Sequence, residues 1–422
     1  MNGRATLADW LTYLATLHPK AIALGLERVR EVYSRLAIAP RGPVIEVAGT
    51  NGKGSTCAFI ERMLAAGGYR VGLYTSPHLT RYNERVRITG SDADDAALRE
   101  AFAAVETVRD GVALTYFEFG TLAALWLFAR EPLDAWVLEV GLGGRLDAVN
   151  IVDADVAVVT SIDVDHVDYL GSTREAIGAE KAGIFRRQHP AICGDRDPPR
   201  SLLEHASALD AKLLRIGIDY DFSASAGQWS YRGPGGARHG LPYPALRGAY
   251  QLANAASALT AVDALRDRMP LSMGAVREAL VGIELPGRFQ VLPGRPVRVL
   301  DVAHNAQAAA ALADTLASMG FHAQTIAVFG IMADKDIDAV IAAMRPRVDR
   351  WMVTTLPPPR GADATMLRAR LVSAGIDASS IETFDDPFDA YRAACEASRE
   401  ADRIVVFGSF QTVAAALSPR FA

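Results

Sequence analysis

The stretch VIEVAGTNGKGST, residues 44–56, combines the residue types that hold a phosphate group. Its three glycines leave backbone N–H groups accessible, and Lys53 adds a positive charge beside a predicted helix N-terminus. The spacing differs from the P-loop pattern G-x-x-x-x-G-K-[ST], because Val47 occupies the first glycine position and Gly54 separates Lys53 from Ser55. We interpret the stretch as a phosphate-binding loop; the alternative is an ordinary glycine-rich turn between a strand and a helix.

Acidic side chains follow two further apolar stretches. Glu139 ends the run DAWVLE, and TSIDVDHVDYLG (160–171) places four polar residues within six positions, at Asp163, Asp165, His166 and Asp168. Ligands of α/β proteins bind at strand ends, and carboxylates suit Mg²⁺, which takes one or two protein oxygens together with phosphates and water. The alternatives are a Glu139 carboxylate that backbone N–H groups satisfy, and an acidic loop that caps the next helix.

The second half of the chain shows a similar pattern. LDVAHNAQA places Asp301, His304 and Asn305 between a predicted strand and a predicted helix, where Asn305 is also a good N-cap. FGIMADKD and FGSFQTV again put glycine and polar residues at strand ends, so this half presents a polar edge to a ligand. Lys181, in AEKAGIF, receives no role from the residue pattern, because a single lysine is usually solvated.

Alternating strands and helices must position these residues. Short apolar, β-branched runs predict strands in the first half at 43–49, 69–75, 134–141, 155–161 and 189–194. Stretches with helical spacing lie between them at 55–68, 95–110 and 117–132. This alternation indicates a mostly parallel sheet with helices on both faces. Residues 217–247, rich in Ser, Gly, Pro and aromatic residues, predict a β-hairpin excursion.

A proline- and glycine-rich stretch divides the chain. Within LPGRFQVLPGRPVRV we expect a linker at 287–296, between a domain at 1–286 and a smaller domain at 297–422. After it the alternation restarts, with strands predicted at 297–303, 324–330, 350–356 and 402–408, and helices between and after them. The expected fold class is α/β: an N-terminal P-loop ATPase-type domain with a mostly parallel sheet, and a smaller C-terminal Rossmann-like α/β domain.

Composition narrows the classes of function. The 422 residues carry a net charge of −5 without a basic run, which argues against a nucleic-acid partner. No run of about 18 apolar residues predicts a membrane span, and the first twenty residues predict an amphipathic helix rather than a signal peptide. The three cysteines, Cys57, Cys193 and Cys395, are far apart and read as small buried hydrophobes. We therefore expect a cytoplasmic location and no membrane partner.

Nine motifs together carry a family resemblance. In order they are VAGTNGKGST, SPHLTRYNERVRI, TYFEFGTLAALWLF, EVGLGGRLDAVN, DHVDYLG, EKAGIF, NAA, PGRFQ and DVAHN. In this combination the chain closely resembles the folylpolyglutamate synthase/dihydrofolate synthase family of the Mur-ligase superfamily, from near its N-terminus to FGSFQTV. ALGLERV and TYFEFGTLAALWLF further resemble the bifunctional bacterial members.

The resemblance implies an ATP-dependent ligase. In this family ATP phosphorylates a carboxylate to an acyl phosphate, and the amine of L-glutamate then displaces phosphate to form an amide. The acceptor is 7,8-dihydropteroate, giving dihydrofolate, and in bifunctional members also a reduced folate whose glutamate tail is extended. An acyl phosphate splits one hard step into two easier ones, and Mg²⁺ and lysine neutralise the phosphate charge.

The resemblance also implies ATP and metal contacts. The ATP contacts would be Thr50, Asn51, Gly52, Lys53, Gly54, Ser55, Asn254, Arg288 and Asp301. Ser76 would share a first Mg²⁺ with Glu139 and His166, whereas the residue pattern alone favours Ser55 as the hydroxyl ligand. Lys181 matches the lysine that the family carbamylates, and the resulting anion would hold a second Mg²⁺.

The remaining implied residues concern catalysis and the other substrates. Lys53, Lys181 and His304 would act in catalysis, and His304 and Ser409 in glutamate binding. Pterin contacts would come from Ala23, Leu24, Gly25, Thr115, Tyr116, Phe117, Glu118, Leu146, Asp147 and Ala148. The chain departs from close relatives at Ala23, where they carry an acidic residue. By resemblance ATP lies between the domains, whose closure would exclude water, and the protein is a monomer.

Three alternatives remain at this point. The first is a folylpolyglutamate synthase without the second activity. Another superfamily ligase, acting on muramyl peptides or cyanophycin, fits the phosphate loop, although TYFE and LGLERV match folate-family contacts. A nucleotide-binding switch without ligase activity fits the loop too, but the Asp/His cluster and DVAHN favour chemistry.

Overall fold

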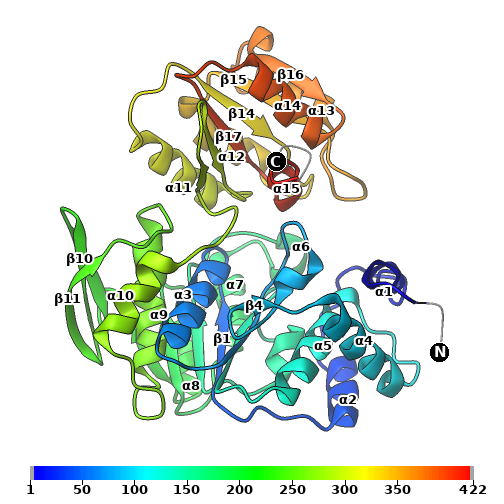
Figure 1. Ribbon diagram of the computed structural model, residues 1–422, viewed down its shortest axis with the longest axis vertical. Coiled ribbons are helices and arrows are strands. Elements are labelled where there is room, and N and C mark those ends of the chain that lie inside the picture. Colours follow the sequence, from blue (N-terminus) through cyan, green and yellow to red (C-terminus); the bar gives the residue numbers. More distant parts are fainter. Residues whose placement is uncertain (1–3, 419–422) are drawn as a thin grey trace. The chain divides into compact units, whose positions relative to one another are not determined.

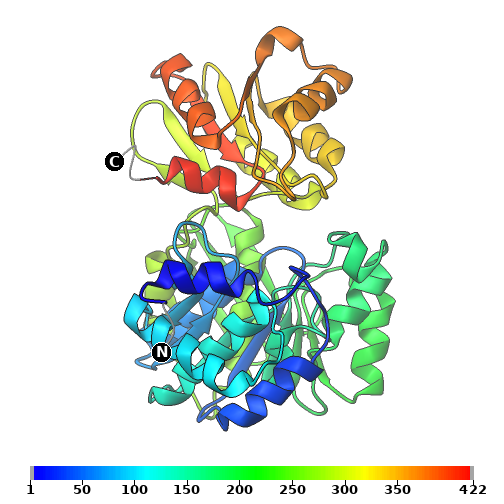
Figure 2. The ribbon, with the colours of Figure 1, turned by 90° about the vertical axis from the view of Figure 1, so that its right-hand side faces the viewer.

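The computed structural model describes residues 4–418 and divides into two compact units. Unit 1 comprises the chain up to Ala245 together with Leu252–Ile283, and unit 2 comprises Leu246–Gln251 together with the chain from Glu284 onward. Each unit is a layered α/β structure with its own sheet (Figures 1 and 2). No helix among residues 4–418 is long and apolar enough to cross a membrane.

Unit 1 is built on an eight-stranded sheet in the order β4-β3-β2-β5-β1-β6-β7-β8. Its strands are β1 (Val44–Ala48), β2 (Val71–Tyr74), β3 (Val86–Ile88), β4 (Ser91–Asp92), β5 (Ala135–Glu139), β6 (Val156–Val159), β7 (Pro190–Cys193) and β8 (Lys212–Arg215). All run parallel except β3 and β4. The five predicted strands and the mostly parallel sheet are confirmed. The other three strands escaped prediction because they lie toward the sheet edges and lack a long apolar run.

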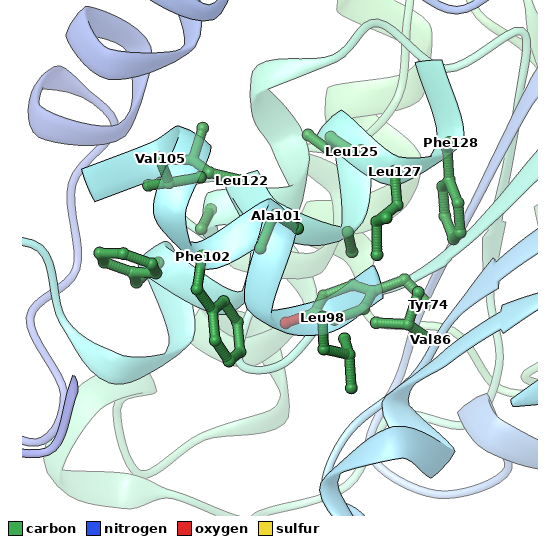
Figure 3. Packing of buried hydrophobic residues seen from close by; sticks show 14 of the residues in the cluster. Tyr74, Val86, Leu98, Ala101, Phe102, Val105, Leu122, Leu125, Leu127 and Phe128 are labelled. Carbon is green, nitrogen blue, oxygen red and sulfur yellow. The ribbon is translucent and has the colours of Figure 1, made fainter. Parts of the chain in front are cut away.

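Helices cover both faces of this sheet (Figure 1). They are α1 (Leu7–Leu14), α2 (Glu27–Leu36), α3 (Lys53–Ala66), α4 (Asp95–Arg109), α5 (Tyr116–Arg130), α6 (Val167–Leu170), α7 (Arg174–Ala182), α8 (Arg200–Ala208), α9 (Tyr250–Asp263) and α10 (Met273–Gly282). Figure 3 shows part of the core, where Phe102 of α4 and Leu122 of α5 pack together near Tyr74 of β2. Cys57 and Cys193 are buried as expected, whereas Cys395 is partly exposed, and none of the three forms a disulfide.

The excursion at 217–247 is a three-stranded antiparallel sheet, ordered β11-β10-β9, rather than a single hairpin. Its strands are β9 (Asp221–Ser225), β10 (Gln228–Gly233) and β11 (Gly236–Pro242). Polar side chains at three-residue intervals on α9 bond to tyrosine and arginine residues of this region, in the pairs Ser257–Tyr220, Thr260–Tyr231 and Asp263–Arg238. This polar stripe holds α9 against the excursion, and α9 carries Asn254 one turn before the stripe.

Unit 2 is built on a six-stranded sheet in the order β12-β13-β17-β14-β15-β16, in which only β12 is antiparallel to its neighbour. Its strands are β12 (Gln290–Leu292), β13 (Val297–Leu300), β14 (Thr325–Phe329), β15 (Arg350–Thr354), β16 (Ile381–Phe384) and β17 (Arg403–Phe407). Its helices are α11 (Ala306–Ala317), α12 (Ile337–Met344), α13 (Ala364–Ser373), α14 (Pro387–Ala397) and α15 (Phe410–Ala416). The predicted α/β fold class is confirmed.

Strand β12 lies inside the stretch 287–296 that the sequence marks as a linker. It pairs with β13, and Pro293, Gly294 and Pro296 lie in the turn between these two strands. Proline and glycine therefore mark a tight hairpin turn here, and the stretch belongs to unit 2 rather than forming a free connection.

Candidate functional site

The glycine-rich loop joins β1 to α3 in unit 1. Gly49 and Gly52 have φ of +151° and +88°, a region that favours glycine. A Cβ atom would lie 1.7 Å from Thr160 Oγ1 at Gly49, and 2.5 Å from Asn254 Oδ1 at Gly52. Helix α3 begins at Lys53, directly after the loop, so its first N–H groups open toward the loop. A helix N-terminus that follows a glycine-rich loop in this way is suited to bind an anion such as phosphate.

The segment after β6 holds the loop in place. Thr50 N–H donates to Ser161 O at 2.7 Å, and Thr160 Oγ1 donates to Asn51 O at 2.6 Å. Lys53 folds back over the loop, where its Nζ donates to two loop carbonyls at 3.1 and 3.3 Å. Since β1 lies between β5 and β6, the loop opens at the carboxyl edge of the sheet, beside the other polar strand ends.

Ser76 and Glu139 meet at the ends of the neighbouring strands β2 and β5. Ser76 N–H donates to Glu139 Oε2 at 3.0 Å, and Glu139 is only 4% exposed. A backbone N–H group thus provides one hydrogen bond to the buried carboxylate of Glu139, which agrees with the alternative interpretation of this residue from the sequence. The same bond also places side by side two residues expected to share a cation.

The Asp/His cluster follows β6 and begins α6. His166 is the N-cap of α6 with φ +54°, and its Nε2 lies 4.0 Å from Asp165 Oδ2. Asp163 and Asp165 each accept the N–H of the next residue at 2.8 Å, so both shape the turn, whereas Asp168 is exposed. No group of three or more His, Cys, Asp or Glu side chains within residues 4–418 could hold a metal ion. A cation here therefore also needs hydroxyl, phosphate or other oxygens, which suits Mg²⁺.

Lys181 is buried on α7, with 3% of its surface exposed. Burial lowers the pKa of its amine, nearby Lys53 adds to this effect, and Asp165 and Asp147 oppose it, so that the pKa is about 7. Much of the amine is therefore uncharged at neutral pH and able to act as a nucleophile. The residue pattern missed this feature, because only the tertiary structure buries the lysine.

Two of the three segments expected to contact the pterin are linked through Arg28. Its Nη2 donates to both Ala23 O and Glu118 Oε1 at 2.8 Å, and so connects the loop before α2 to the start of α5. Gly25 N–H donates to Leu146 O at 3.3 Å, which brings in the third segment. The structure therefore brings together residues that are more than a hundred positions apart in the sequence. Our sequence reasoning did not single out Arg28, although it lies in the ALGLERV motif.

The start of α5 is capped by side chains and carries two aromatic rings. Thr115 and Glu118 form a reciprocal capping box at its N-terminus. The Phe117 ring packs so closely on Gly141 that a Cβ there would lie 2.6 Å from Phe117 Cζ. Tyr116 packs edge-on against another tyrosine, with ring centroids 5.9 Å apart. These rings are partly buried and offer a surface on which a planar ligand can stack.

Asp147 belongs to the third acceptor segment and lies within electrostatic range of Lys53. It is 3% exposed, and its carboxylate accepts the N–H groups of Leu142 and Val149 at 2.8 and 3.0 Å. Burial raises the pKa of Asp147 to about 7, against the lowering effects of these backbone bonds and of Lys53. Ala148 is buried next to it, and Leu24 is partly exposed.

In unit 2 the expected residues gather after β13. Asp301 is buried and accepts the N–H groups of Phe289 and Ala303 at 2.8 Å each. Burial raises the pKa of Asp301, and the nearby Arg288 opposes this effect. His304 follows, with Nδ1 2.9 Å from the carbonyl of Val302.

Two side chains of this region have structural roles as helix caps. Asn305 Oδ1 accepts Ala308 N–H at 3.0 Å, so the predicted N-cap of α11 is confirmed. Ser409 is buried, and its Oγ accepts Thr412 N–H at 3.1 Å as the N-cap of α15. The Ser409 hydroxyl is thus engaged within the protein.

Comparison with known proteins identifies the family. The model of the Mur ligase middle domain matches residues 47–262, and that of the Mur ligase, glutamate ligase domain matches residues 287–410. The chain is 45% identical to the dihydrofolate synthase/folylpolyglutamate synthase of Escherichia coli over 97% of this chain and 94% of that protein. It is 35% identical to the Mycobacterium tuberculosis enzyme of the same name, over 77% of this chain and 72% of that protein.

Solved structures agree with the sequence comparison. The structure of E. coli FolC in complex with DHPP and ADP is similar with a TM-score of 0.93 and 44% identity, covering 99% of this chain and 98% of that one. A bifunctional folylpolyglutamate synthase/dihydrofolate synthase with Mn, AMPPNP and L-glutamate bound gives a TM-score of 0.91 and 45% identity, with coverage of 99% and 98%. The chain belongs to the Mur ligase family and, within it, to the dihydrofolate synthase/folylpolyglutamate synthases.

Proposed function

We propose that the protein is an ATP-dependent ligase that joins 7,8-dihydropteroate, and the glutamate tail of reduced folates, to L-glutamate, releasing ADP and phosphate. The observation that carries this proposal is the carboxyl edge of the sheet in unit 1. There a phosphate loop, the Ser76–Glu139 pair and a buried Lys181 lie close to the three linked acceptor segments. Near full-length similarity to bifunctional enzymes supports both activities.

The reaction has two covalent steps. A carboxylate oxygen of the acceptor attacks the γ-phosphorus of ATP, the bond to the bridging oxygen breaks, and ADP leaves with that electron pair. The glutamate nitrogen then attacks the acyl carbon of the acyl phosphate; phosphate leaves with its bonding electrons, and the nitrogen loses a proton. Phosphoryl transfer needs positioning and charge neutralisation more than covalent catalysis, which is what a rigid loop and lysine provide.

For ATP we assign the loop residues Thr50, Asn51, Gly52, Lys53, Gly54 and Ser55. Asn254 supports this role because it lies against Gly52, and its helix is fixed by the polar stripe on α9. In unit 2 we assign Arg288 and Asp301 to ATP as well, and His304 to the reacting groups. The glutamate-ligase role of residues 297–422 follows the matched family description.

The divalent metal ion supplies charge neutralisation for the phosphates, and the donor set fits Mg²⁺. We assign Ser76, Glu139 and His166 to a first ion. Lys181 would hold a second ion after carbamylation, in which its uncharged amine adds to CO₂ and loses a proton, so that the carbamate oxygens carry a negative charge. The lowered pKa of Lys181 supports this assignment, because only the free amine reacts with CO₂.

For the acceptor we assign Ala23–Gly25, Thr115–Glu118 and Leu146–Ala148. Glutamate binding by His304 and Ser409 has less support, because the Ser409 hydroxyl already caps α15. We place the enzyme in the cytoplasm and expect a monomer without a nucleic-acid partner, which agrees with its net charge of −5.

Product analysis tests the proposal. The purified protein is incubated with ATP, Mg²⁺ and L-glutamate, with dihydropteroate or tetrahydrofolate side by side, and ADP release and product masses are measured. We expect one added glutamate on dihydropteroate and one or more on tetrahydrofolate. Turnover of tetrahydrofolate alone would indicate a folylpolyglutamate synthase, and nucleotide binding without turnover of either acceptor would contradict a ligase.

A further inference from the structure

Arg85 is a buried cation that the reaction described above does not use. It ends the short 3₁₀ helix η1 (Tyr82–Arg85), in the SPHLTRYNERVRI stretch between β2 and β3, and only 9% of its surface is exposed. Its carbonyl accepts Thr75 N–H at 2.9 Å. Arg85 therefore lies beside the residue that precedes Ser76, at the carboxyl edge where the site is built.

The neighbours of the Arg85 guanidinium are uncharged. Its Nε donates to His78 Nδ1 at 2.8 Å, and its Cζ lies 5.3 Å from the ring centroid of Tyr82 and 5.5 Å from that of Tyr116. Because Nδ1 of His78 accepts this N–H, that nitrogen carries no proton and the imidazole is a neutral acceptor. Tyr116 belongs to the segment assigned to the acceptor, so the cation lies at that substrate's site.

No carboxylate pairs with Arg85 in the part of the chain that the structure describes. The preceding residue, Glu84, instead accepts N–H groups from residues 79–81. Arg87, two residues further on, pairs with buried Glu61 at 3.2 Å. A buried charge is normally paired, because an unpaired one is costly to remove from water. This arginine therefore fits a site for a ligand anion.

We propose that Arg85 binds a carboxylate of the acceptor, namely the carboxylate of a folate's terminal glutamate that is not activated. The proposal rests on the ligase function above. Dihydropteroate carries a single carboxylate, which reacts, whereas a glutamate tail carries a second one that must also be held. A guanidinium binds a carboxylate through two parallel hydrogen bonds and keeps its charge at every physiological pH. Arg85 thus determines specificity for the folate acceptor over the pteroate acceptor.

The test compares two acceptors on the same enzyme. For Arg85→Met we expect the KM for tetrahydrofolate to rise about 10- to 100-fold, as for loss of a charge-assisted hydrogen-bond pair. The KM for dihydropteroate should rise about 10-fold less than the KM for tetrahydrofolate, so that the ratio of kcat/KM for the two acceptors changes about 10-fold. Arg85→Lys, which keeps the charge but not the fork, should give an intermediate ratio. Arg87→Met is the matched control, because that arginine is already paired within the protein.

Thermal stability separates binding from a structural role. Because no carboxylate depends on Arg85, Arg85→Met should keep or raise the Tm, whereas Arg87→Met should lower it by leaving Glu61 unpaired. A loss of Tm in Arg85→Met, an equal rise of KM for both acceptors, or an unchanged KM for tetrahydrofolate would each overturn the assignment. If the unsubstituted enzyme turned over dihydropteroate but not tetrahydrofolate, the assignment would also be overturned. Wild-type turnover of neither acceptor would instead refute the proposed function itself.

Discussion

Lys181 gives the most quantitative prediction, because its burial changes how much free amine is present. The pKa falls from 10.5 to about 7. At pH 7.5 a group with the lower value is roughly three-quarters uncharged, whereas an exposed lysine is uncharged in about one molecule in a thousand. The amine that can add to CO₂ is therefore enriched about 700-fold at this position. Since the lowered pKa leaves the amine free above about pH 7, carbamate should form there and decline as the pH falls below it.

Carbon NMR with ¹³C-bicarbonate measures the carbamate directly. We expect a carbamate signal in the wild-type protein at pH 7.5 that weakens toward pH 6 and is missing in Lys181→Ala. Lys212→Ala, in which an exposed lysine of the same unit is removed, should keep the signal. In the same Lys181→Ala protein, ligation should fall about 100-fold or more, with the affinity for ATP within about 3-fold.

A short-chain carboxylic acid should partly restore turnover to Lys181→Ala, because its carboxylate can take the place of the missing anion. An identical ¹³C signal in Lys181→Ala would refute the carbamate at this position. Wild-type ligation in that variant would refute any role of Lys181 in catalysis. Full activity of the wild-type protein in CO₂-free buffer, with the signal absent, would show that the free amine acts without modification.

Three further substitutions test other parts of the site and fold. Gly52→Ala should weaken ATP binding about 10-fold or more in calorimetry, because the added methyl group would meet the buried amide of Asn254. Gly68→Ala is the control: Gly68 has a similar φ of +87° but open space around it, so this variant should bind ATP normally. Equal affinities of the two variants for ATP would contradict the steric argument. Glu46 is fully buried on β1, with both carboxylate oxygens unpaired and a pKa raised well above its usual value by burial. The folded state therefore keeps a proton that the unfolded chain loses, so stability falls as the pH rises above about 4.5, by up to about 1.4 kcal/mol per pH unit; Glu46→Gln should reduce this slope in urea unfolding between pH 5 and 8, and parallel curves would refute it. Arg28→Ala should raise the KM for dihydropteroate about 10-fold, because it releases the loop before α2. Arg35→Ala, on the same helix, should leave this KM unchanged. An equal rise in both variants would show that the KM depends on the stability of α2 rather than on the link made by Arg28.

Much of the fold follows from local pattern. The buried parallel strands are continuous apolar runs, and helix caps such as Asn305 are recognisable from one side chain and its position. The failures have local causes as well. Strands β3, β4 and β8 are short and lie toward the sheet edges, and the proline–glycine turn after β12 looks like a linker when only composition is considered.

The site divides in the same way between sequence and tertiary structure. The sequence by itself determined the phosphate loop, the polar strand ends and, through nine ordered motifs, the family. It could not show that Lys181 is buried beside another lysine, that Arg28 links two acceptor segments, or that Arg85 lacks a paired carboxylate. Burial and charge pairing depend on side chains that are distant in sequence and meet only when the sheet assembles. A pKa or an unpaired charge is therefore a property of the folded chain rather than of any motif.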